Sequence, residues 1–461
     1  MTLIKSISGI RGTIGGKPND NLTPVDVVRF AAAYGTYILS QANVSKAKVV
    51  IGRDARISGS MVQALVSNTL IGLGIDVIDL GMATTPTVEM VVPKENAQGG
   101  IILTASHNPK QWNALKLLDS KGEFLNAAAG AHILDLADKE NFDFASVDDL
   151  GKISKNNTSL EMHIQEVINH PLVTVDKIKA SGLKIVVDGV NSIGGIAIPA
   201  LLKEFDLEVI ELYCEPNGQF PHNPEPLKEH LGALSEKVIE TGADLGIVVD
   251  PDVDRLAFMD ENGEMFGEEY TLVACADYVL SKKSGNTVSN MSSTRALRDV
   301  TEKHGGSYFS SAVGEVNVVT KMKEVDAVIG GEGNGGIIDP QLHYGRDSLI
   351  GTALFLSLLS GLKLSVSELK KTYPEYFMSK GKIELEPSME VDHLLNEIKK
   401  KYTDNKPNTI DGVKIDFENS WVHLRKSNTE PIIRVYTEAP SQLEADDLMN
   451  RFKAELLTFV N

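Results

Sequence analysis

The chain of 461 residues is too long for one hydrophobic core, and at roughly 100 to 200 residues per domain it should divide into three or four domains. Its hydrophobic content of 42% and formal net charge of −18 are those of an acidic globular protein. This charge disfavours broad binding to nucleic acids or anionic membranes, which need a basic surface. Any anionic substrate must therefore be met by local clusters of Arg and Lys.

Apolar segments and cysteines give no sign of a membrane or an oxidising compartment. Residues 1–12 lack a long apolar core followed by a cleavage site, and the most apolar later run, residues 349–359, is too short to span a bilayer. Cys214 and Cys275 lie in apolar stretches, which is typical of buried small side chains rather than of a disulfide or a metal pair. We therefore expect a cytoplasmic enzyme, monomeric or homodimeric, with neither nucleic acid nor membrane as a partner.

The sequence patterns of three segments predict βαβ units. Residues 48–80 begin with an apolar strand, pass through a polar turn and a helical pattern over 61–73, and end in a second strand. Residues 184–213 repeat this plan, with a turn at Gly194-Gly195 before the helix. A weaker copy covers residues 287–309.

The strands of these units are continuous apolar runs, such as residues 99–103 and 245–249, which is typical of mostly parallel sheets covered on both faces. The chain after residue 366 differs, because three short strands there look antiparallel and an amphipathic helix follows over 441–459. The sequence therefore predicts three related α/β domains with mostly parallel mixed sheets, and a smaller C-terminal α+β domain. The expected domains are residues 1–150, 151–254, 255–367 and 368–461.

The most informative motif is Thr104-Ala105-Ser106-His107-Asn108-Pro109, a polar turn directly after an apolar strand. Functional turns gather at the carboxyl ends of parallel strands, so this turn presents the Ser106 hydroxyl for chemistry. An isolated serine is more often a helix cap or a turn residue, but His107 and Lys116 accompany this one. Lys116 would act as a general acid or base if its surroundings lower its pKa, or otherwise as a charge clamp for phosphate. His107 would take part in the chemistry or hold the turn in shape.

Three carboxylates at alternate positions, those of Asp250, Asp252 and Asp254, follow another apolar run. At an extended strand end all three would face one way, and their repulsion would be relieved by a cation such as Mg²⁺. An EF-hand loop is disfavoured, because Arg255 stands where that loop needs glycine and because a strand precedes it. A solvated acidic turn is the remaining alternative.

Two further turns offer groups for a phosphosugar. Residues 330–336 are rich in glycine, which lets the backbone approach a ligand, while Glu332 and Asn334 present acceptors and donors for sugar hydroxyls. A phosphate cradle is the rival hypothesis, but it would open a helix and carry Lys with Ser or Thr. The other turn is a candidate phosphate dock, or else a surface hairpin with chance basic residues. Its cations and small donors are Arg425, Ser427, Asn428, Thr429 and Arg434.

In this order, the motifs resemble those of the α-D-phosphohexomutase family, which includes phosphoglucomutases, phosphomannomutases and phosphoglucosamine mutases. The resemblance covers nearly the whole chain, from Gly9-Ile10-Arg11-Gly12 to Arg434. It implies a heart-shaped molecule of four domains, in which one loop from each domain reaches a central cleft.

The resemblance also implies roles for single residues. Ser106 would be the phosphoserine that donates the phosphoryl group, and it would bind Mg²⁺ together with the three aspartates. Arg11 and Lys116 match positions near the reacting group, with Lys116 a candidate general acid or base. The substrate-binding positions would be Glu332 and Asn334 in the sugar-selecting loop, Arg425, Ser427, Asn428 and Thr429 in the loop that holds the non-reacting phosphate, and Arg255 and Arg434 beside these loops.

The implied reaction passes a phosphoryl group to one end of a hexose phosphate and takes the other phosphoryl group back, with a hexose 1,6-bisphosphate as intermediate and activator. Many relatives have Ser-Gly-His where this chain has Asn334-Gly335-Gly336, so no acid–base role is carried over there. Val313-Gly314-Glu315-Val316 looks closer to phosphoglucosamine mutases, whereas residues 218–226 look closer to phosphomannomutases and phosphoglucomutases. We favour glucosamine phosphates as substrates.

Two other functions fit part of the pattern. A non-catalytic sugar-phosphate-binding protein would need the phosphate dock, but it has no use for a nucleophile such as Ser106. A metal-dependent phosphatase would use an aspartate of the motif from Asp250 to Arg255 as its nucleophile, but this chain lacks the threonine expected after the second acid.

Overall fold

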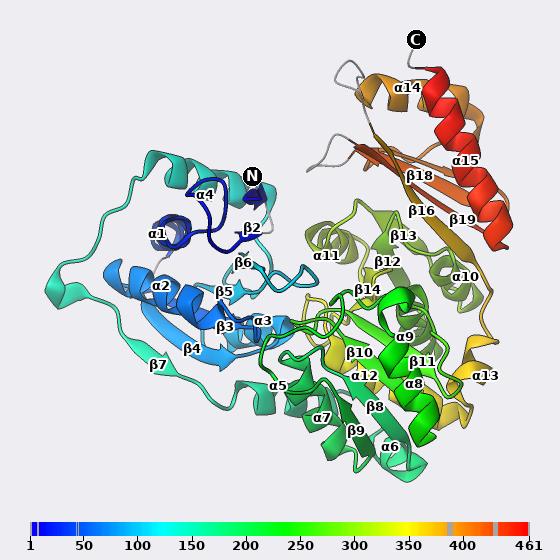
Figure 1. Ribbon diagram of the computed structural model, residues 1–461, viewed down its shortest axis with the longest axis horizontal. Coiled ribbons are helices and arrows are strands. Elements are labelled where there is room, and N and C mark those ends of the chain that lie inside the picture. Colours follow the sequence, from blue (N-terminus) through cyan, green and yellow to red (C-terminus); the bar gives the residue numbers. More distant parts are fainter. Residues whose placement is uncertain are drawn as a thin grey trace.

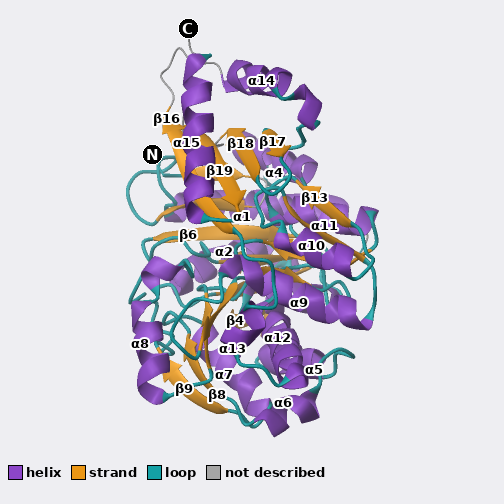
Figure 2. Cartoon of the chain, turned by 90° about the vertical axis from the view of Figure 1, so that its right-hand side faces the viewer, coloured by secondary structure: helices purple, strands orange, loops and turns teal. Residues whose placement is uncertain are grey.

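In the described part of the chain four β-sheets follow one another, and we call the units built on them domains I to IV (Figure 1). The computed structural model describes residues 2–6, 9–42, 44, 46–384, 391–426 and 432–459. Domains I to III are α/β units with mixed sheets, and domain IV carries α14 and α15 against an antiparallel sheet (Figure 2). The predicted fold class is confirmed.

Domain I contains a seven-stranded sheet in the order β1-β2-β6-β5-β3-β4-β7. Its strands β5, β3, β4 and β7 pair in parallel, whereas β6, β2 and β1 pair antiparallel. The strands are β1 (Ile4–Ser6), β2 (Gly9–Thr13), β3 (Lys48–Arg53), β4 (Asp76–Met82), β5 (Gly99–Leu103), β6 (Trp112–Leu118) and β7 (Ile153–Lys155). The helices are α1 (Pro24–Gln41), α2 (Gly59–Gly72), α3 (Thr85–Lys94) and α4 (Ala127–Lys139), followed by the 3₁₀ turn η1 (Val147–Asp149).

Domain II contains a four-stranded sheet in the order β11-β10-β8-β9, in which only β11 pairs antiparallel. The strands are β8 (Lys184–Asp188), β9 (Glu208–Leu212), β10 (Leu245–Val249) and β11 (Leu256–Asp260). The helices are α5 (Ser159–Ile168), α6 (Val175–Ser181), α7 (Gly194–Glu204) and α8 (Gly232–Thr241), with the 3₁₀ turn η2 (Lys228–His230).

The glycine pair of domain II was expected in a turn, but α7 begins at Gly194. A Cβ atom on Gly195 would lie 2.4 Å from the Cα of Cys214, and one on Gly194 would lie 2.4 Å from a methyl group of Val249. The pair therefore permits the close approach of α7 to its neighbours, and the expectation of a turn is wrong.

Domain III contains a four-stranded sheet in the order β13-β12-β14-β15, in which only β15 pairs antiparallel. The strands are β12 (Asn286–Asn290), β13 (Tyr308–Ser311), β14 (Ala327–Glu332) and β15 (Gly336–Ile338). The helices are α9 (Glu268–Lys282), α10 (Ala296–Lys303), α11 (Glu315–Glu324), α12 (Ser348–Leu362) and α13 (Val366–Lys370).

Domain IV contains an antiparallel sheet in the order β16-β19-β18-β17. The strands are β16 (Phe377–Glu384), β17 (Val413–Asp416), β18 (Trp421–Lys426) and β19 (Ile432–Ala439). The helices are α14 (Val391–Lys401) and α15 (Gln442–Thr458), with the 3₁₀ turn η3 (Thr403–Asn405). Strand β16 was not expected, because only two of its side chains, Ser379 and Ile383, are buried and its sequence shows no clear alternation.

The three expected domain boundaries each divide structure that belongs together. Past residue 150, β7 still pairs with β4 of the first sheet, and past residue 254, β11 still pairs with β10 of the second sheet. The boundary at residue 367 falls inside α13. Sequence patterns indicate strands but not their partners, which explains these differences.

The largest hydrophobic cluster joins domains II and III into one block. Phe258 of β11 stacks on Phe355 of α12 with ring centroids 3.7 Å apart, and Phe266 meets the same ring edge-on at 5.2 Å. Domains I and IV have hydrophobic clusters of their own. Within the described part of the chain, no helix has the length and apolar character needed to cross a bilayer.

A chain of buried polar side chains joins domain I to this block. Asp347 meets His163 Nε2 at 2.8 Å and His343 Nε2 at 3.2 Å through its Oδ2 atom. The Nδ1 atom of His343 lies 3.5 Å from the carboxylate of Glu89, which has no hydrogen-bond partner among the described residues. Burial and the nearby charge of Glu315 raise the pKa of Glu89 well above its ordinary value.

Replacing Glu89 with methionine should stabilise the protein by about 1–3 kcal/mol at pH 7, because it removes a buried carboxyl group that lacks a hydrogen-bond partner. The raised pKa keeps Glu89 protonated in the folded state while the unfolded chain ionises above about pH 4.3, so the wild type loses stability as the pH rises from that value. The advantage of the variant should therefore shrink toward pH 4. Urea unfolding between pH 4 and 8 measures it.

The exposed Glu204 provides the control, since Glu204→Met should change stability by less than about 0.5 kcal/mol at any of these pH values. A Glu89→Met variant that is less stable than the wild type at pH 7 would contradict the unpartnered state of Glu89.

Candidate active site

The turn that carries Ser106 follows β5 and leads into β6. Ser106 has a φ of 50°, which is rare for a residue with a side chain and marks a conformation that the surroundings must hold. Its backbone N–H donates to Thr104 Oγ1 at 2.9 Å, and that hydroxyl donates to Asp54 Oδ2 at 2.7 Å. Ser106 as a whole residue is only 8% exposed, so it lies in a largely buried site.

Arg56 fixes the backbone of this turn. Its guanidinium, which is 1% exposed, pairs with Asp54 Oδ2 at 2.9 Å and donates to four carbonyl oxygens of the turn. The acceptors are Ser106 O at 2.5 Å, Asn108 O at 2.7 Å, Pro109 O at 2.8 Å and Trp112 O at 3.0 Å. One buried cation thus replaces the regular hydrogen bonds that a turn of this length lacks.

The aspartates 250, 252 and 254 lie on the turn between β10 and β11. The expected extended strand end is wrong, because the chain turns after Val249 and Val253 has a φ of 65°. The turn nevertheless brings one carboxylate oxygen of each aspartate within 4.8 Å of the others, and all three side chains are fully buried. Ser106 Oγ donates to Asp250 Oδ2 at 2.7 Å, so the serine and the aspartates form one site.

The donor atoms of this triad suit a hard cation such as Mg²⁺. Lys116 Nζ donates to Asp252 Oδ2 at 2.6 Å and to Asp254 Oδ2 at 3.2 Å, while the Oδ1 atoms of both aspartates are buried without a hydrogen-bond partner among the described residues. Burial and the charges of its two neighbours raise the pKa of Asp250 well above its ordinary value. Three buried carboxylates, two of which have an oxygen without a partner among the described residues, are the arrangement that a divalent cation relieves.

Lys116 is held in its charged form. Burial alone would lower its pKa, but the carboxylates of Asp252 and Asp254 raise the pKa of Lys116 above its ordinary value. Of the two hypotheses for this lysine, the charge clamp is therefore favoured over a general base. His107 differs, because burial and the charge of Arg255 lower its pKa to about 2 and keep its imidazole neutral. Its Nδ1 atom lies 3.4 Å from Ser106 Oγ.

Two arginines bring positive charge to the same place. Burial and the like charge of Arg255 lower the pKa of Arg11. Arg255 Nη1 pairs with Glu225 at 3.0 Å, but the Nε atoms of both arginines are buried without a partner in the described part of the chain. An anion between such groups would be bound favourably.

Residues 330–336, the sugar loop, lie next to the turn between β10 and β11 that carries the three aspartates. We call that turn the metal loop. Glu332 ends β14 and is 5% exposed; its Oε1 atom accepts from Asn290 Nδ2 at 2.8 Å and from the Gly314 N–H at 3.0 Å. Its Oε2 atom accepts from Arg346 Nη1 at 2.9 Å. Asn334 Oδ1 accepts from the Gly336 N–H at 3.2 Å.

The expected phosphate dock lies on domain IV. Ser427, Asn428 and Thr429 fall outside the described residues. Arg425 of β18 stands directly opposite Arg434 of β19, and its Nε atom lies 3.6 Å from Asp411 Oδ2. Asp411 Oδ2 also accepts from the Val313 N–H at 3.1 Å, so this part of domain IV contacts the loop of domain III that supports Glu332.

Three residues of the site were missed from the sequence, namely Arg56, Thr85 and Arg346. Thr85 Oγ1 donates to Asp252 Oδ2 at 2.5 Å from the start of α3, and Arg346 Nη2 donates to Asp254 Oδ2 at 2.7 Å. Arg56 and Arg346 lie between elements, and Thr85 is the first residue of α3. None of them carries a motif, so only the tertiary structure shows their partners.

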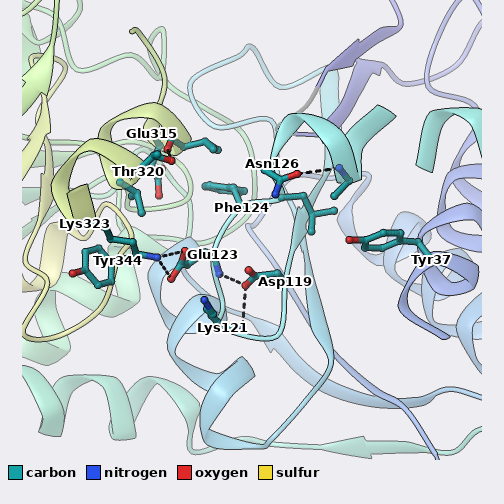
Figure 3. A pocket seen from close by; sticks show the side chains of 14 residues that line it. Tyr37, Asp119, Lys121, Glu123, Phe124, Asn126, Glu315, Thr320, Lys323 and Tyr344 are labelled. Atoms are coloured by element: carbon teal, nitrogen blue, oxygen red, sulfur yellow. Dashed lines mark hydrogen bonds and ion pairs between the residues drawn. The ribbon is translucent and has the colours of Figure 1, made fainter. Parts of the chain in front are cut away.

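A polar cavity of about 280 Å³ lies beside the site, between domain I and α11 (Figure 3). On one side Lys323 Nζ reaches both carboxylate oxygens of Glu123, at 2.6 and 2.5 Å, and so joins domain III to domain I. Glu315 lines the cavity and also pairs with Arg346 at 2.9 Å, which connects the cavity wall to the metal loop.

Known proteins match this chain along its length. The models for phosphoglucomutase/phosphomannomutase alpha/beta/alpha domains I, II and III match residues 3–144, 161–263 and 267–376, and the model for the C-terminal domain matches residues 382–455. A phosphoglucomutase/phosphomannomutase from Thermococcus kodakarensis is 35% identical over 95% of this chain and 96% of its own. A probable phosphoglucosamine mutase from Methanopyrus kandleri is 33% identical over 96% of both chains.

Solved structures share the fold. A phosphoglucomutase/phosphomannomutase family protein from Burkholderia thailandensis superposes with a TM-score of 0.85 over 99% of this chain and 98% of its own, at 23% identity. An N-acetylphosphoglucosamine mutase from Aspergillus fumigatus, solved with GlcNAc-6P and magnesium, has a TM-score of 0.56 at 16% identity over 91% of this chain and 84% of its own. With these matches, the fold and the site define an isomerase that transfers phosphoryl groups. The chain belongs to the phosphoglucomutase/phosphomannomutase family of the α-D-phosphohexomutase superfamily.

Replacing Arg56 with methionine should destabilise the protein by about 3–5 kcal/mol, because Asp54 would stay buried without its ion pair. The double variant Asp54→Asn/Arg56→Met should recover part of this loss, since no unpaired charge remains. The amide protons of the turn from Ser106 to Trp112 should exchange faster with solvent in both variants. Urea unfolding and hydrogen exchange measure the two effects.

A matched control is Arg298→Met, since Arg298 lies 3.9 Å from its two carboxylate neighbours and should contribute less than about 1 kcal/mol. Unchanged exchange in the turn of the Arg56 variants would refute the role given to this guanidinium.

Proposed function

We propose that the protein is a phosphohexomutase that interconverts hexose 6-phosphate and hexose 1-phosphate through a phosphorylated Ser106, with glucosamine phosphates as its preferred substrates. The observation that carries the proposal is the 2.7 Å hydrogen bond from Ser106 Oγ to Asp250 Oδ2 within the buried triad. This places a nucleophilic hydroxyl beside oxygens that lack other partners. A binding protein would gain nothing from such an arrangement.

The charges around Ser106 support a phosphorylated state. Arg11 and Arg255 carry like charges in this part of the site, and a phosphoryl group on Ser106 would supply an anion that offsets them. Asp250, Asp252 and Asp254 together with that phosphoryl group would hold Mg²⁺. When bound, Mg²⁺ would supply positive charge against that of the transferring group.

The two halves of the reaction need the same groups. In the first half, the bond from phosphorus to Ser106 Oγ breaks as a sugar hydroxyl oxygen bonds to the phosphorus. The proton that the sugar hydroxyl loses is balanced by the proton that Ser106 Oγ gains as it leaves. In the second half, the bisphosphate has turned round, and its other phosphoryl group passes to Ser106 Oγ. Catalysis rests on positioning and electrostatic stabilisation, with Lys116 as a fixed cation beside Asp252.

The remaining residues would bind the substrate. We assign sugar hydroxyls to Glu332 and Asn334, since both lie on the turn next to the metal loop. We assign the non-reacting phosphate to Arg425, Arg434 and the residues 427–429 between their strands. A hexose 1,6-bisphosphate as activator and a cytoplasmic setting remain predictions.

Substituting Ser106 with alanine should lower mutase turnover by about 10⁴-fold or more, because the group that carries the phosphoryl would be lost. Conversion of glucosamine 6-phosphate to the 1-phosphate, primed with the bisphosphate and MgCl₂, measures this. Ser40→Ala, on the exposed end of α1, should retain full turnover. Negligible turnover of the wild type as well would favour a non-catalytic sugar-phosphate-binding protein, and phosphate release that survives in Ser106→Ala would favour a phosphatase.

Turnover should be fastest with glucosamine phosphates when glucosamine, glucose and mannose phosphates are compared, each primed with its own bisphosphate. The resemblance of Val313-Gly314-Glu315-Val316 to phosphoglucosamine mutases motivates this preference, and the Gly314 N–H of this stretch donates to Glu332. Adding EDTA should abolish turnover with every sugar, and excess MgCl₂ should restore it. Equal rates for the three sugars would defeat the preference for glucosamine but not the mutase assignment.

A further inference from the structure

Arg346 connects the metal loop to the sugar loop. Its guanidinium, on the segment between β15 and α12, is surrounded by carboxylates from three elements. Nη2 donates to Asp254 Oδ2 at 2.7 Å, Nε to Glu315 Oε2 at 2.9 Å and Nη1 to Glu332 Oε2 at 2.9 Å. The arginine is only 8% exposed, so these ion pairs are shielded from solvent.

The contact with Asp254 determines which oxygen faces the cation site. Arg346 and Lys116 both occupy Oδ2 of Asp254, whereas Oδ1 is buried without a hydrogen-bond partner among the described residues. A ligand carboxylate held through one oxygen keeps the other oxygen directed at the cation.

Arg346 also holds the Glu332 side chain in place. Its Oε1 atom is already held by Asn290 and by the Gly314 N–H, and Arg346 holds the second oxygen. A carboxylate held at both oxygens cannot rotate, so the sugar loop has one set position relative to Arg346. Asp254 and Glu332 therefore take their positions from the same guanidinium.

Backbone hydrogen bonds join the same segments. The Ser348 N–H donates to Val253 O at 3.2 Å, the Asp347 N–H to Ile337 O at 2.8 Å, and the Leu256 N–H to Gly335 O at 3.0 Å. The metal loop, the sugar loop and the segment of Arg346 thus form one connected unit.

The space that Arg346 fills depends on Gly336. A Cβ atom at position 336 would lie 2.3 Å from the Cδ atom of Arg346, which no side chain can tolerate. The arginine from the neighbouring segment therefore occupies the volume that a side chain at position 336 would need.

We propose that Arg346 is a positioning residue that couples the cation site to the sugar loop, by holding Asp254 and Glu332 at the same time in the space left by Gly336. The proposal rests on the proposed function only in naming a hexose phosphate as the ligand. A cation bound at the aspartates and a sugar bound at Glu332 would each require the same guanidinium position, so each should bind more tightly in the presence of the other.

Equilibrium binding tests the proposal without turnover. Binding of Mn²⁺ alone is followed by electron paramagnetic resonance, and binding of glucosamine 6-phosphate by calorimetry with and without Mn²⁺. In Arg346→Met, the affinity for Mn²⁺ should fall about 10–100-fold. The enhancement of sugar-phosphate affinity by Mn²⁺, present in the wild type, should disappear. Arg346→Lys keeps the positive charge but lacks the planar guanidinium that contacts three carboxylates. It should therefore show little more coupling than Arg346→Met.

Two further variants keep the result unambiguous. Lys323→Met breaks the contact with Glu123 between domains III and I and should retain both affinities and their coupling. Gly336→Ala leaves every ion-pairing residue present but displaces Arg346, so it should reproduce both effects of Arg346→Met. In the Arg346→Ala background, Gly336→Ala should have almost no further effect.

Tighter binding of Mn²⁺ in Arg346→Met would overturn the proposal, because it would mean that the arginine only repels the cation. Coupling that survives in both Arg346→Met and Gly336→Ala would overturn it as well. If the wild type shows the coupling but no mutase turnover, and Arg346→Met loses the coupling, the proposed function would be refuted and this inference would stand. The two failures are therefore distinguishable.

Discussion

Three carboxylates buried within 4.8 Å of one another are the constraint on which the site depends. Left alone, they would repel strongly, and burial together with that repulsion raises the pKa of Asp250. Lys116 and Arg346 offset part of it at the Oδ2 atoms. Because these cations come from domains I and III while the aspartates come from domain II, the same electrostatics that form the site also hold the three domains together.

The same arrangement of strands places the functional turn in each α/β sheet. In each α/β sheet one strand at the end of the parallel set is followed by an antiparallel neighbour, which gives the hairpins β5–β6, β10–β11 and β14–β15. Their connections carry Ser106, the aspartates and Asn334. The fourth connection, between β18 and β19, is also antiparallel. Chain reversal at the carboxyl end of a strand therefore recurs at every turn assigned to the site.

The order of elements and the two chemical motifs could be predicted from the sequence, because apolar runs and polar turns are local signals. The groups that position those motifs could not. Arg56 lies about fifty residues before the turn whose carbonyls it binds, and Arg346 lies 92 residues from Asp254. Even the triad was expected for the wrong reason: a turn with Val253 at positive φ, rather than an extended strand, brings the aspartates together.

The strongly acidic composition and an anionic substrate are reconciled by how the cations are held. Arg56, Lys116 and Arg346 each pair with buried carboxylates, so their positive charges hold parts of the site in position rather than attract ligands. Arg11 and Arg255 differ, because each retains a buried Nε–H group without a partner in the described residues, although Arg255 also pairs with Glu225. A net charge of −18 thus coexists with two guanidinium groups that still offer N–H donors to an anion. Burial and the charges of these arginines lower the pKa of His107, whose Nδ1 atom lies 3.4 Å from Ser106 Oγ.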